Sequence, residues 1–416
     1  MAPRLVLRAV VSQHVESAAF LWLLRDAAVW SPHYTLRDLE QLDERIEAHL
    51  DGLRIAEDAG WVMSKQELAH GEPGEVFTAG VMAFHSGELN RIQPVLDVAC
   101  RSLDLGRPLV SALGWLQVDE ALGPIQQLMA SESPVLRRFG IAGAALHRLD
   151  PGPPLDRALG HADPLLRGRA CQAAGEIGRR NLLPQIRESL TDKDEGCRFA
   201  AARAAGLLGD ASAVRVLGAF AAGGGRFADE ACTLGIRLFD EATALAAHRE
   251  LAQRPTLHRV AVLAAGAAGY PSLVPWLFAE MRRPELARIA GEALTTITGL
   301  DLASHGFEGH PPDGFDAGPS EDPADDDVAL DPDENLPWPN EETLQQWWSE
   351  AQGEFRSDTR YMLGEPVTAE SLWRALQTGR QRTRAAAAIE LALASAGHPL
   401  FEVRAPAFRQ LASLRG

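Results

Sequence analysis

The sequence predicts an all-α fold built as a row of stacked helix pairs, an α-solenoid. A short sequence motif, which we call the repeat phrase, begins with arginine and continues with alanine and glycine. It starts at Arg137, Arg167 and Arg198, so its copies are 30 and then 31 residues apart. The glycine pairs 175/178 and 206/209 also step by 31. Helix-favouring alanine and leucine dominate the apolar content, while Tyr (3) and Phe (14) are few. A period of this length is typical of stacked units that present a long binding surface.

Residues 1–70 are expected to form a helical cap ahead of the array. Residues 12–30 are apolar enough for burial on most of a helix surface, and Pro32 ends this helix because proline lacks a backbone donor. Thr35 and Asp38 form a capping pair for a second helix. That helix carries leucine and isoleucine at every third or fourth position, an amphipathic stripe. We expect Gly60 and Trp61 to close it.

Residues 71–302 are expected to hold the array. A degenerate copy of the phrase lies at 108–114, and looser copies follow at 231–235, 264–269 and 288–293. In each predicted helix pair the first helix carries the phrase, and the second carries apolar residues such as Leu182 and Ile186. The pattern stops at Thr298–Gly299–Leu300.

Residues 303–340 are expected to be a flexible acidic linker. They contain eleven acidic residues, seven prolines and no lysine or arginine, so they offer too little apolar surface to offset the entropy of ordering. This segment holds most of the formal net charge of −17, whereas residues 133–240 carry +3. A body so near to charge balance argues against a general nucleic-acid binder, which needs a basic stripe.

Residues 341–416 are expected to be helical again. Thr343, Leu344, Trp347 and Trp348 suit an amphipathic helix, and residues 382–387 echo the repeat phrase. We expect this segment to be a capping unit that rejoins the array after the acidic excursion.

The recurring Asp/Arg–Ala–Ala–Gly phrase resembles the HEAT repeat family, most clearly over residues 105–300 and in its short bacterial variety. A narrower resemblance is carried by residues 14–22, by residues 42–53, and by Leu336–Pro337–Trp338–Pro339 ahead of Trp347–Trp348. These segments resemble a proteobacterial family of HEAT-like proteins whose genes often neighbour those of type VI secretion systems. The resemblance implies an accessory role, with a secretion component or an effector as the protein partner.

The repeated arginines Arg137, Arg167 and Arg198 are the first candidates for partner contact, because they could line a groove for an anionic ligand. We favour an internal ladder, in which each arginine pairs with a carboxylate of a neighbouring turn and fixes the stacking angle. The aspartates placed for such pairs are Asp163, Asp192 and Asp194.

Aromatic and acidic residues near the end of the linker are the other candidates. Trp338, Trp347 and Trp348 could anchor a partner, with packing into a core as the alternative. The run Asp325–Asp326–Asp327 lacks the frame of a calcium loop, even with the acids at 331–334. We interpret it as a solvated segment that occupies a basic site on a partner or covers the protein's own groove.

The sequence shows no spacing typical of catalysis or of a metal site. The four cysteines lie far apart, and neither CxxC nor HExxH occurs. Charged residues of the first two helices are interpreted as a salt-bridged surface between those helices. They are His14, Glu16, Arg25, Asp26, His33, Asp43, Arg45, His49 and Asp51. We therefore expect no cofactor and no metal.

These observations favour a non-enzymatic protein-binding scaffold with an adaptor, chaperone-like or immunity role. The alternative is a HEAT-like enzyme, because arrays of this kind support DNA-base excision and chromophore attachment. The sequence contains no run of 18 apolar residues, so it predicts no membrane-spanning helix. The amino terminus resembles a secretion signal only faintly. We expect a cytoplasmic protein and leave its oligomeric state open.

Overall fold

A computed structural model describes residues 7–315, 317–318 and 331–415, and it confirms the all-α prediction: this part of the chain forms helices α1–α22 and one short hairpin. The chain folds into two compact units. Unit 1 contains residues 1–30, 34–200 and 397–416, and unit 2 contains residues 31–33 and 201–396.

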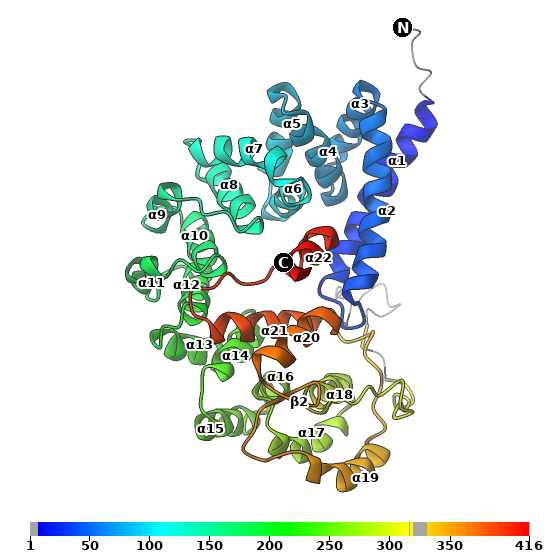
Figure 1. Ribbon diagram of the computed structural model, residues 1–416, viewed down its shortest axis with the longest axis vertical. Coiled ribbons are helices and arrows are strands. Elements are labelled where there is room, and N and C mark those ends of the chain that lie inside the picture. The colour runs from blue at the N-terminus through cyan, green and yellow to red at the C-terminus, as the bar shows by residue number, and fades with distance from the viewer. Residues whose placement is uncertain (1–6, 316, 319–330, 416) are drawn as a thin grey trace. The chain divides into compact units, whose positions relative to one another are not determined.

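Unit 1 begins with three helices and continues with helix pairs, whose first helices α4, α6, α8 and α10 pack against one another in turn (Figure 1). Its helices are α1 (Arg8–Ala28), α2 (Leu36–Ile55), α3 (Asp58–Glu67), α4 (Pro73–Ser86), α5 (Leu89–Ala99), α6 (Leu103–Trp115), α7 (Val118–Ala130), α8 (Pro134–Leu146), α9 (Pro153–Leu159), α10 (Pro164–Glu176), α11 (Leu183–Ser189), the start of α12 (Glu195–Leu207) and α22 (Ala407–Arg415).

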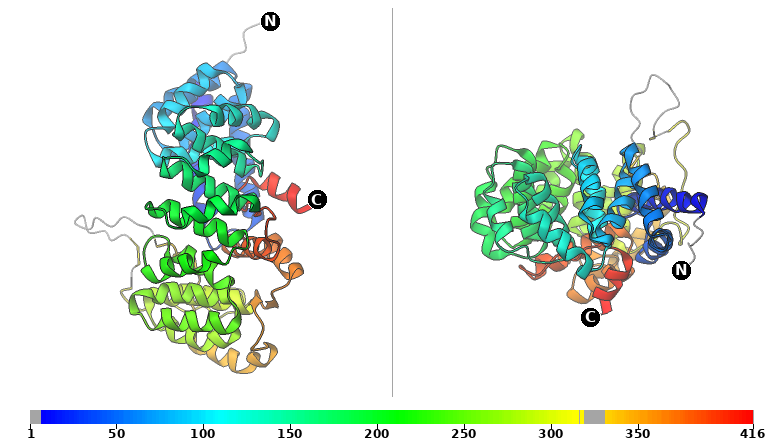
Figure 2. Two further views of the ribbon diagram at one scale, coloured as in Figure 1. Left: turned by 90° about the vertical axis from the view of Figure 1, so that its left-hand side faces the viewer. Right: turned by 90° about the horizontal axis from the view of Figure 1, so that it is seen from above.

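Unit 2 continues the pairs in parallel layers, with the first helices α14, α16 and α18 in contact (Figure 2). Its elements are the end of α12, α13 (Ser212–Gly223), α14 (Ala228–Arg237), α15 (Glu241–Ala252), α16 (His258–Ala268), α17 (Val274–Met281), α18 (Pro284–Thr298), α19 (Glu341–Ala351), β1 (Tyr361–Met362), β2 (Glu365–Pro366), α20 (Ala369–Thr378) and α21 (Gln381–Ala394). Strands β1 and β2 pair antiparallel.

The predicted end of the second helix is wrong. Helix α2 ends at Ile55, and Gly60 and Trp61 lie inside α3. Glu57 adopts a φ of 52°, which breaks the helix direction. Gly60 then packs so close to the backbone of Leu53 that a Cβ would lie 2.2 Å from the Leu53 carbonyl oxygen.

The repeat phrase forms tightly packed first helices because its small residues face inward. In α10, Ala170, Ala173 and Ala174 are fully buried. Proline at the first position starts α8, α10 and α18, where its missing N–H costs no hydrogen bond. Gly178 follows α10 with a φ of 79°, a left-handed conformation that suits glycine. The glycine stops at Gly178 and Gly209 keep the 31-residue period, whereas the proline start is absent from α12, which begins at Glu195.

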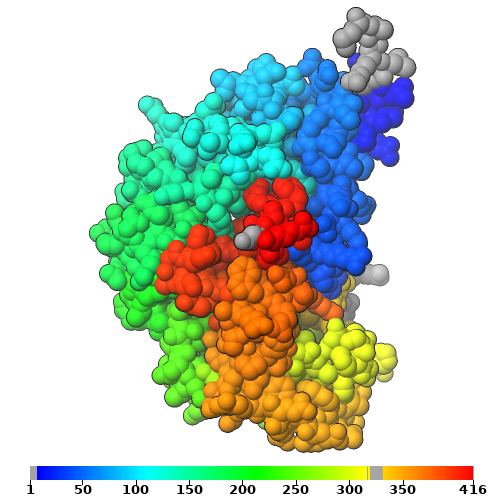
Figure 3. All heavy atoms as spheres, in the orientation of Figure 1, coloured from blue at the N-terminus to red at the C-terminus, as the bar shows by residue number. Residues whose placement is uncertain are grey.

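After α18 the chain turns and runs back along the units instead of adding another repeat. In unit 2, α19 packs on α17, and the Tyr361 N–H donates to the Gly269 carbonyl at the end of α16 (2.8 Å). Figure 3 shows the orange atoms of this segment on the outside of unit 2. In unit 1, the Leu400 N–H donates to the Glu176 carbonyl at the end of α10 (2.8 Å). Residues 341–415 therefore do more than cap an end: in each unit they contact C-terminal ends of first helices, such as those of α16 and α10, and we call these helix ends the array edge.

Candidate protein-interaction site

The array edge of unit 1 holds residues 397–406, which lie outside the helices, partly through their backbone. Arg148 Nε donates to the Leu400 carbonyl (2.6 Å). In the opposite direction, Arg409 of α22 donates to the Leu146 and Leu116 carbonyls (both 3.3 Å), which lie just at or after the ends of α8 and α6. Contacts of this kind do not depend on side-chain identity, so they suit the binding of an extended chain.

The end of this segment closes over a buried ion pair. Arg25 Nε donates to Asp43 Oδ1 at 2.7 Å, and both side chains are only 6% exposed. The second carboxylate oxygen of Asp43 accepts from the Ala407 N–H (2.6 Å), and Arg25 Nη2 donates to the Ala405 carbonyl (2.9 Å). The predicted charged surface between the first two helices thus includes a buried pair that binds the carboxy-terminal segment.

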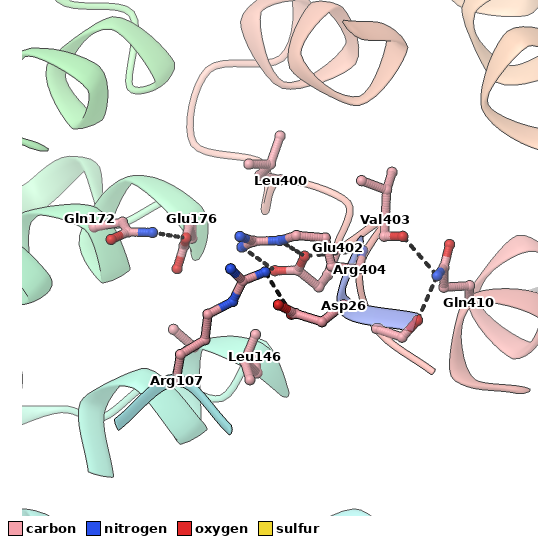
Figure 4. A network of polar contacts seen from close by, with 12 residues as sticks. Asp26, Arg107, Leu146, Gln172, Glu176, Leu400, Glu402, Val403, Arg404 and Gln410 are labelled. Carbon is pink, nitrogen blue, oxygen red and sulfur yellow. Dashed lines mark hydrogen bonds and ion pairs between the residues drawn. The ribbon is translucent and has the colours of Figure 1, made fainter. Parts of the chain in front are cut away.

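Glu402 is the charged centre of the segment, as Figure 4 shows. Burial alone would raise its pKa, but Arg404 and Arg148 outweigh burial, so the pKa of Glu402 lies far below its ordinary value. Arg404 Nε donates to Glu402 at 3.0 Å and Arg148 at 3.3 Å. The carboxylate therefore stays ionised and ties the segment to its neighbours.

In unit 2, three arginines from three helices converge on one acidic stretch. We call Arg259 (α16), Arg288 (α18) and Arg382 (the start of α21) the arginine cluster, and residues 331–336 the acidic arm. Arg288 Nη2 lies 2.5 Å from Asp331 Oδ2. Asp333 pairs with Arg259 on one carboxylate oxygen and with Arg382 Nη1 on the other (3.1 Å).

The backbone of the acidic arm is held as well. Arg382 Nη2 donates to the Pro332 carbonyl (2.5 Å) and Arg288 Nη1 to the Glu334 carbonyl (3.0 Å). As a result Asp333 is only 4% exposed. Composition alone predicts a free linker over 303–340, but this end of it is fixed because arginines neutralise its carboxylates and its apolar residues, such as Leu336, are buried.

The repeated arginines form the expected ladder in its clearest copy. Arg167 Nη2 lies 2.6 Å from Asp192 Oδ2, and Arg198 Nη1 donates to the Asp192 carbonyl (2.7 Å). Arg137 Nη2 lies 3.0 Å from His161 Nε2, so a histidine stands where the next unit has aspartate. Asp163 and Asp194 serve instead as N-terminal caps, accepting from the backbone N–H groups of Leu166 and Cys197.

The three tryptophan candidates all pack against other residues. Trp348 is buried in the core of unit 2, and Trp347 is half-buried between Phe307 and Trp348. Trp338 stacks near Phe315 and lies under the Arg288 guanidinium, 5.8 Å from it. Asp325, Asp326 and Asp327 lie outside the described residues.

Sequence reasoning missed the arginine cluster although one signal for it was present. Arg288 lies eleven residues before Gly299, the left-handed glycine that ends α18. Arg167 has the same spacing to Gly178, and Arg198 to Gly209. Arg288 therefore occupies the repeated arginine position, and only its partner comes from a distant part of the chain.

The fold and this arginine ladder define a helical-repeat array, and comparison with known proteins agrees. Residues 153–225 match the family model of HEAT repeats. A search of curated proteins finds no match. HEAT repeats generally mediate protein interactions, so the match suggests a protein-interaction scaffold.

The described residues show neither a membrane-spanning helix nor a metal site. Among residues 7–315, 317–318 and 331–415, no helix combines the length and apolar character that a membrane span requires. The same part of the chain contains no group of three His, Cys, Asp or Glu side chains placed to hold a metal ion.

Proposed function

We propose that this protein is a non-enzymatic scaffold that binds an extended segment of another protein along its array edge. The observation that supports the proposal is that arginines of each unit form hydrogen bonds with the backbone of distant segments of the same chain. At the array edge of unit 1, Arg148 donates to the Leu400 carbonyl. Near the starts of α18 and α21 in unit 2, Arg288 and Arg382 donate to the Glu334 and Pro332 carbonyls of the acidic arm. Arginine suits this work because its planar fork of donors binds carbonyl and carboxylate oxygens together.

The partner that we propose is a type VI secretion component or a secreted effector, in an adaptor, chaperone-like or immunity role. This part of the proposal rests on the resemblance of residues 14–22, 42–53 and 336–348 to HEAT-like proteins encoded near secretion genes.

Affinity capture from lysate of the source cells tests the proposal. The full chain is immobilised, proteins retained at low salt are identified by mass spectrometry, and each candidate is produced pure and titrated against the scaffold. A one-to-one complex with a secretion protein is the expected result. If no purified candidate binds, while the scaffold turns over a small substrate, the proposal is overturned.

A further inference from the structure

The acidic arm of unit 2 has the same local structure as a loop between two repeats of unit 1. That loop reads Asp192–Lys193–Asp194–Glu195, and the arm reads Asp331–Pro332–Asp333–Glu334, so both follow the pattern Asp-x-Asp-Glu. In the loop, the Asp194 N–H donates to Asp192 Oδ1 at 2.9 Å. In the arm, the Asp333 N–H donates to Asp331 Oδ1, also at 2.9 Å.

Each of these segments binds a repeated arginine in the same way. The free oxygen of Asp192 lies 2.6 Å from Arg167 Nη2, and that of Asp331 lies 2.5 Å from Arg288 Nη2. Arg167 and Arg288 share the same register in their helices, eleven residues before the terminal glycine. The arm therefore gives the last repeat the contact that a following repeat would otherwise supply.

The second aspartate distinguishes the arm from the loop. Asp194 caps α12 by accepting from the Cys197 N–H (2.7 Å). No helix begins directly after Asp333, because residues 334–340 precede α19. Its carboxylate turns instead to Arg259 and Arg382. The arginine cluster therefore recognises both carboxylates of an Asp-x-Asp-Glu segment, together with two of its backbone carbonyls.

Charge within the cluster favours an anionic occupant. The cluster has three arginines, and two further carboxylates touch it: Glu292 lies 2.7 Å from Arg382 Nη1, and Asp229 lies 3.7 Å from Arg259 Nε. Without the arm the site has one surplus positive charge. With both arm carboxylates bound it has one surplus negative charge, so the arm satisfies the arginines fully.

We infer that the arginine cluster is a docking site for an acidic Asp-x-Asp-Glu segment on the surface of a partner protein, and that the protein's own acidic arm occupies this site by imitating a repeat loop. This inference rests on the proposed scaffold function and names its binding chemistry. The partner's segment must displace a tethered competitor, whose effective concentration is high, so the unmodified protein binds the isolated segment weakly.

A labelled synthetic peptide, Asp-Pro-Asp-Glu-Asn-Leu-Pro-Trp-Pro, tests the inference in the full chain by fluorescence anisotropy. We expect the variant Asp331→Asn/Asp333→Asn to bind this peptide at least about tenfold more tightly than the wild type, because its own arm no longer competes. Adding Arg288→Ala to that variant removes the gain. Adding Arg374→Ala, an exposed arginine whose ion pairs within the described residues are with Glu365 and Glu370, leaves the gain unchanged.

Two further measurements keep the test decisive. A peptide with Asn-Pro-Asn-Gln in place of the acidic residues must not bind; equal binding of both peptides overturns the inference. If the double variant does not fold, hydrogen exchange of the wild type with excess peptide replaces it. Faster exchange at the Leu336 N–H, which donates to the Asp333 carbonyl, supports displacement of the arm, and unchanged exchange contradicts it.

Failure of the scaffold proposal and failure of the docking-site inference give different results. If a purified secretion protein binds the wild type and the Arg288→Ala variant equally, the scaffold function stands and the arginine cluster is not its site. If the wild type forms dimers in light scattering that the double variant does not form, and the peptide does not bind, the site takes the acidic arm of a second copy of this chain, and the inference of a different partner is overturned.

Discussion

Arg237 and Glu390 form an ion pair of 3.0 Å with side chains only 5% and 6% exposed, although 153 residues separate them. The pair joins α14, inside the array, to α21 of the returning chain. Arg360 binds the same carboxylate and also donates to the Ala268 carbonyl at the end of α16 (3.0 Å). One glutamate thus pairs with two arginines at the array edge of unit 2.

Replacing this glutamate should destabilise unit 2 strongly. Glu390→Ala leaves two arginines without their carboxylate in a buried site, which typically costs about 3–5 kcal/mol. Urea denaturation followed by circular dichroism measures the change. Glu365→Ala is the matched control, because it removes an exposed partner of Arg374 and should cost no more than about 1 kcal/mol. Equal losses for the two variants would contradict a buried link at Glu390.

Gly269 should tolerate alanine less well than Gly87. Both glycines end a first helix with positive φ, 73° and 68°, so alanine is strained by about 1–2 kcal/mol at either position. A Cβ at Gly269 would lie 2.5 Å from the Tyr361 carbonyl oxygen, whereas a Cβ at Gly87 would meet nothing within 4 Å. The extra loss in Gly269→Ala, about 1–3 kcal/mol, measures the close approach of the returning chain. Thermal unfolding of the two variants compares them directly.

Two buried histidines should make the protein less stable in mild acid. Burial lowers the pKa of His147 and of His248 to about 4, and the Nδ1 of the first and the Nε2 of the second have no hydrogen-bond partner among the residues that the structure describes. The unfolded chain therefore binds more protons than the folded one between pH 4 and 6.5, so this stability is complete above pH 6.5 and is lost as the pH falls towards 4.

Denaturation midpoints at pH 6.5 and 5 measure this effect. Each histidine should contribute a loss of about 1–2 kcal/mol over that interval. The variant His248→Phe keeps an aromatic ring beside Trp276. Its loss of stability between pH 6.5 and 5 should be smaller than that of the wild type by the contribution of one histidine. An unchanged loss in this variant would show that His248 is protonated normally in the folded protein.

Arg167 distinguishes a structural ladder from a binding groove. Arg167→Ala removes the pair with Asp192 and the hydrogen bonds to the His161 and Ala162 carbonyls (2.7 and 2.8 Å). We expect a loss of about 1.5–3 kcal/mol in stability and no change in partner affinity. Arg157→Ala, at an exposed position of α9, is the control and should change neither. Lost partner binding with full stability would favour the groove.

The repeat architecture could be predicted because its causes are local. Proline starts, alanine faces and glycine stops each act within one helix, and the period carries them from unit to unit. The same logic found the pair of Arg167 with an aspartate of the next loop. The same reasoning could have predicted a carboxylate partner for Arg288, because its spacing to Gly299 repeats that of Arg167 to Gly178.

The sequence predicts that residues 341–416 return to the array, but the contacts of this returning chain could not be predicted, because nothing near it in the sequence describes its partners. Glu402 pairs with Arg148 across 254 residues, and Ala407 with Asp43 across 364. Strands β1 and β2 have two residues each, too few to form an alternating pattern. The acidic residues at 331–334 have the composition of a solvated segment, and only the convergence of three distant arginines makes that stretch ordered.

The hydrogen bond from the Ala407 N–H to Asp43 has a consequence for biosynthesis. Most helical repeats gain their stability from neighbours, so they can assemble as they leave the ribosome. Here the buried pair of Arg25 and Asp43 gains its remaining hydrogen bonds only when residues 405–407 have been translated. A nascent chain that stalls before residue 405, or is cut ahead of it, leaves this pair incompletely hydrogen-bonded and exposed to chaperones and proteases.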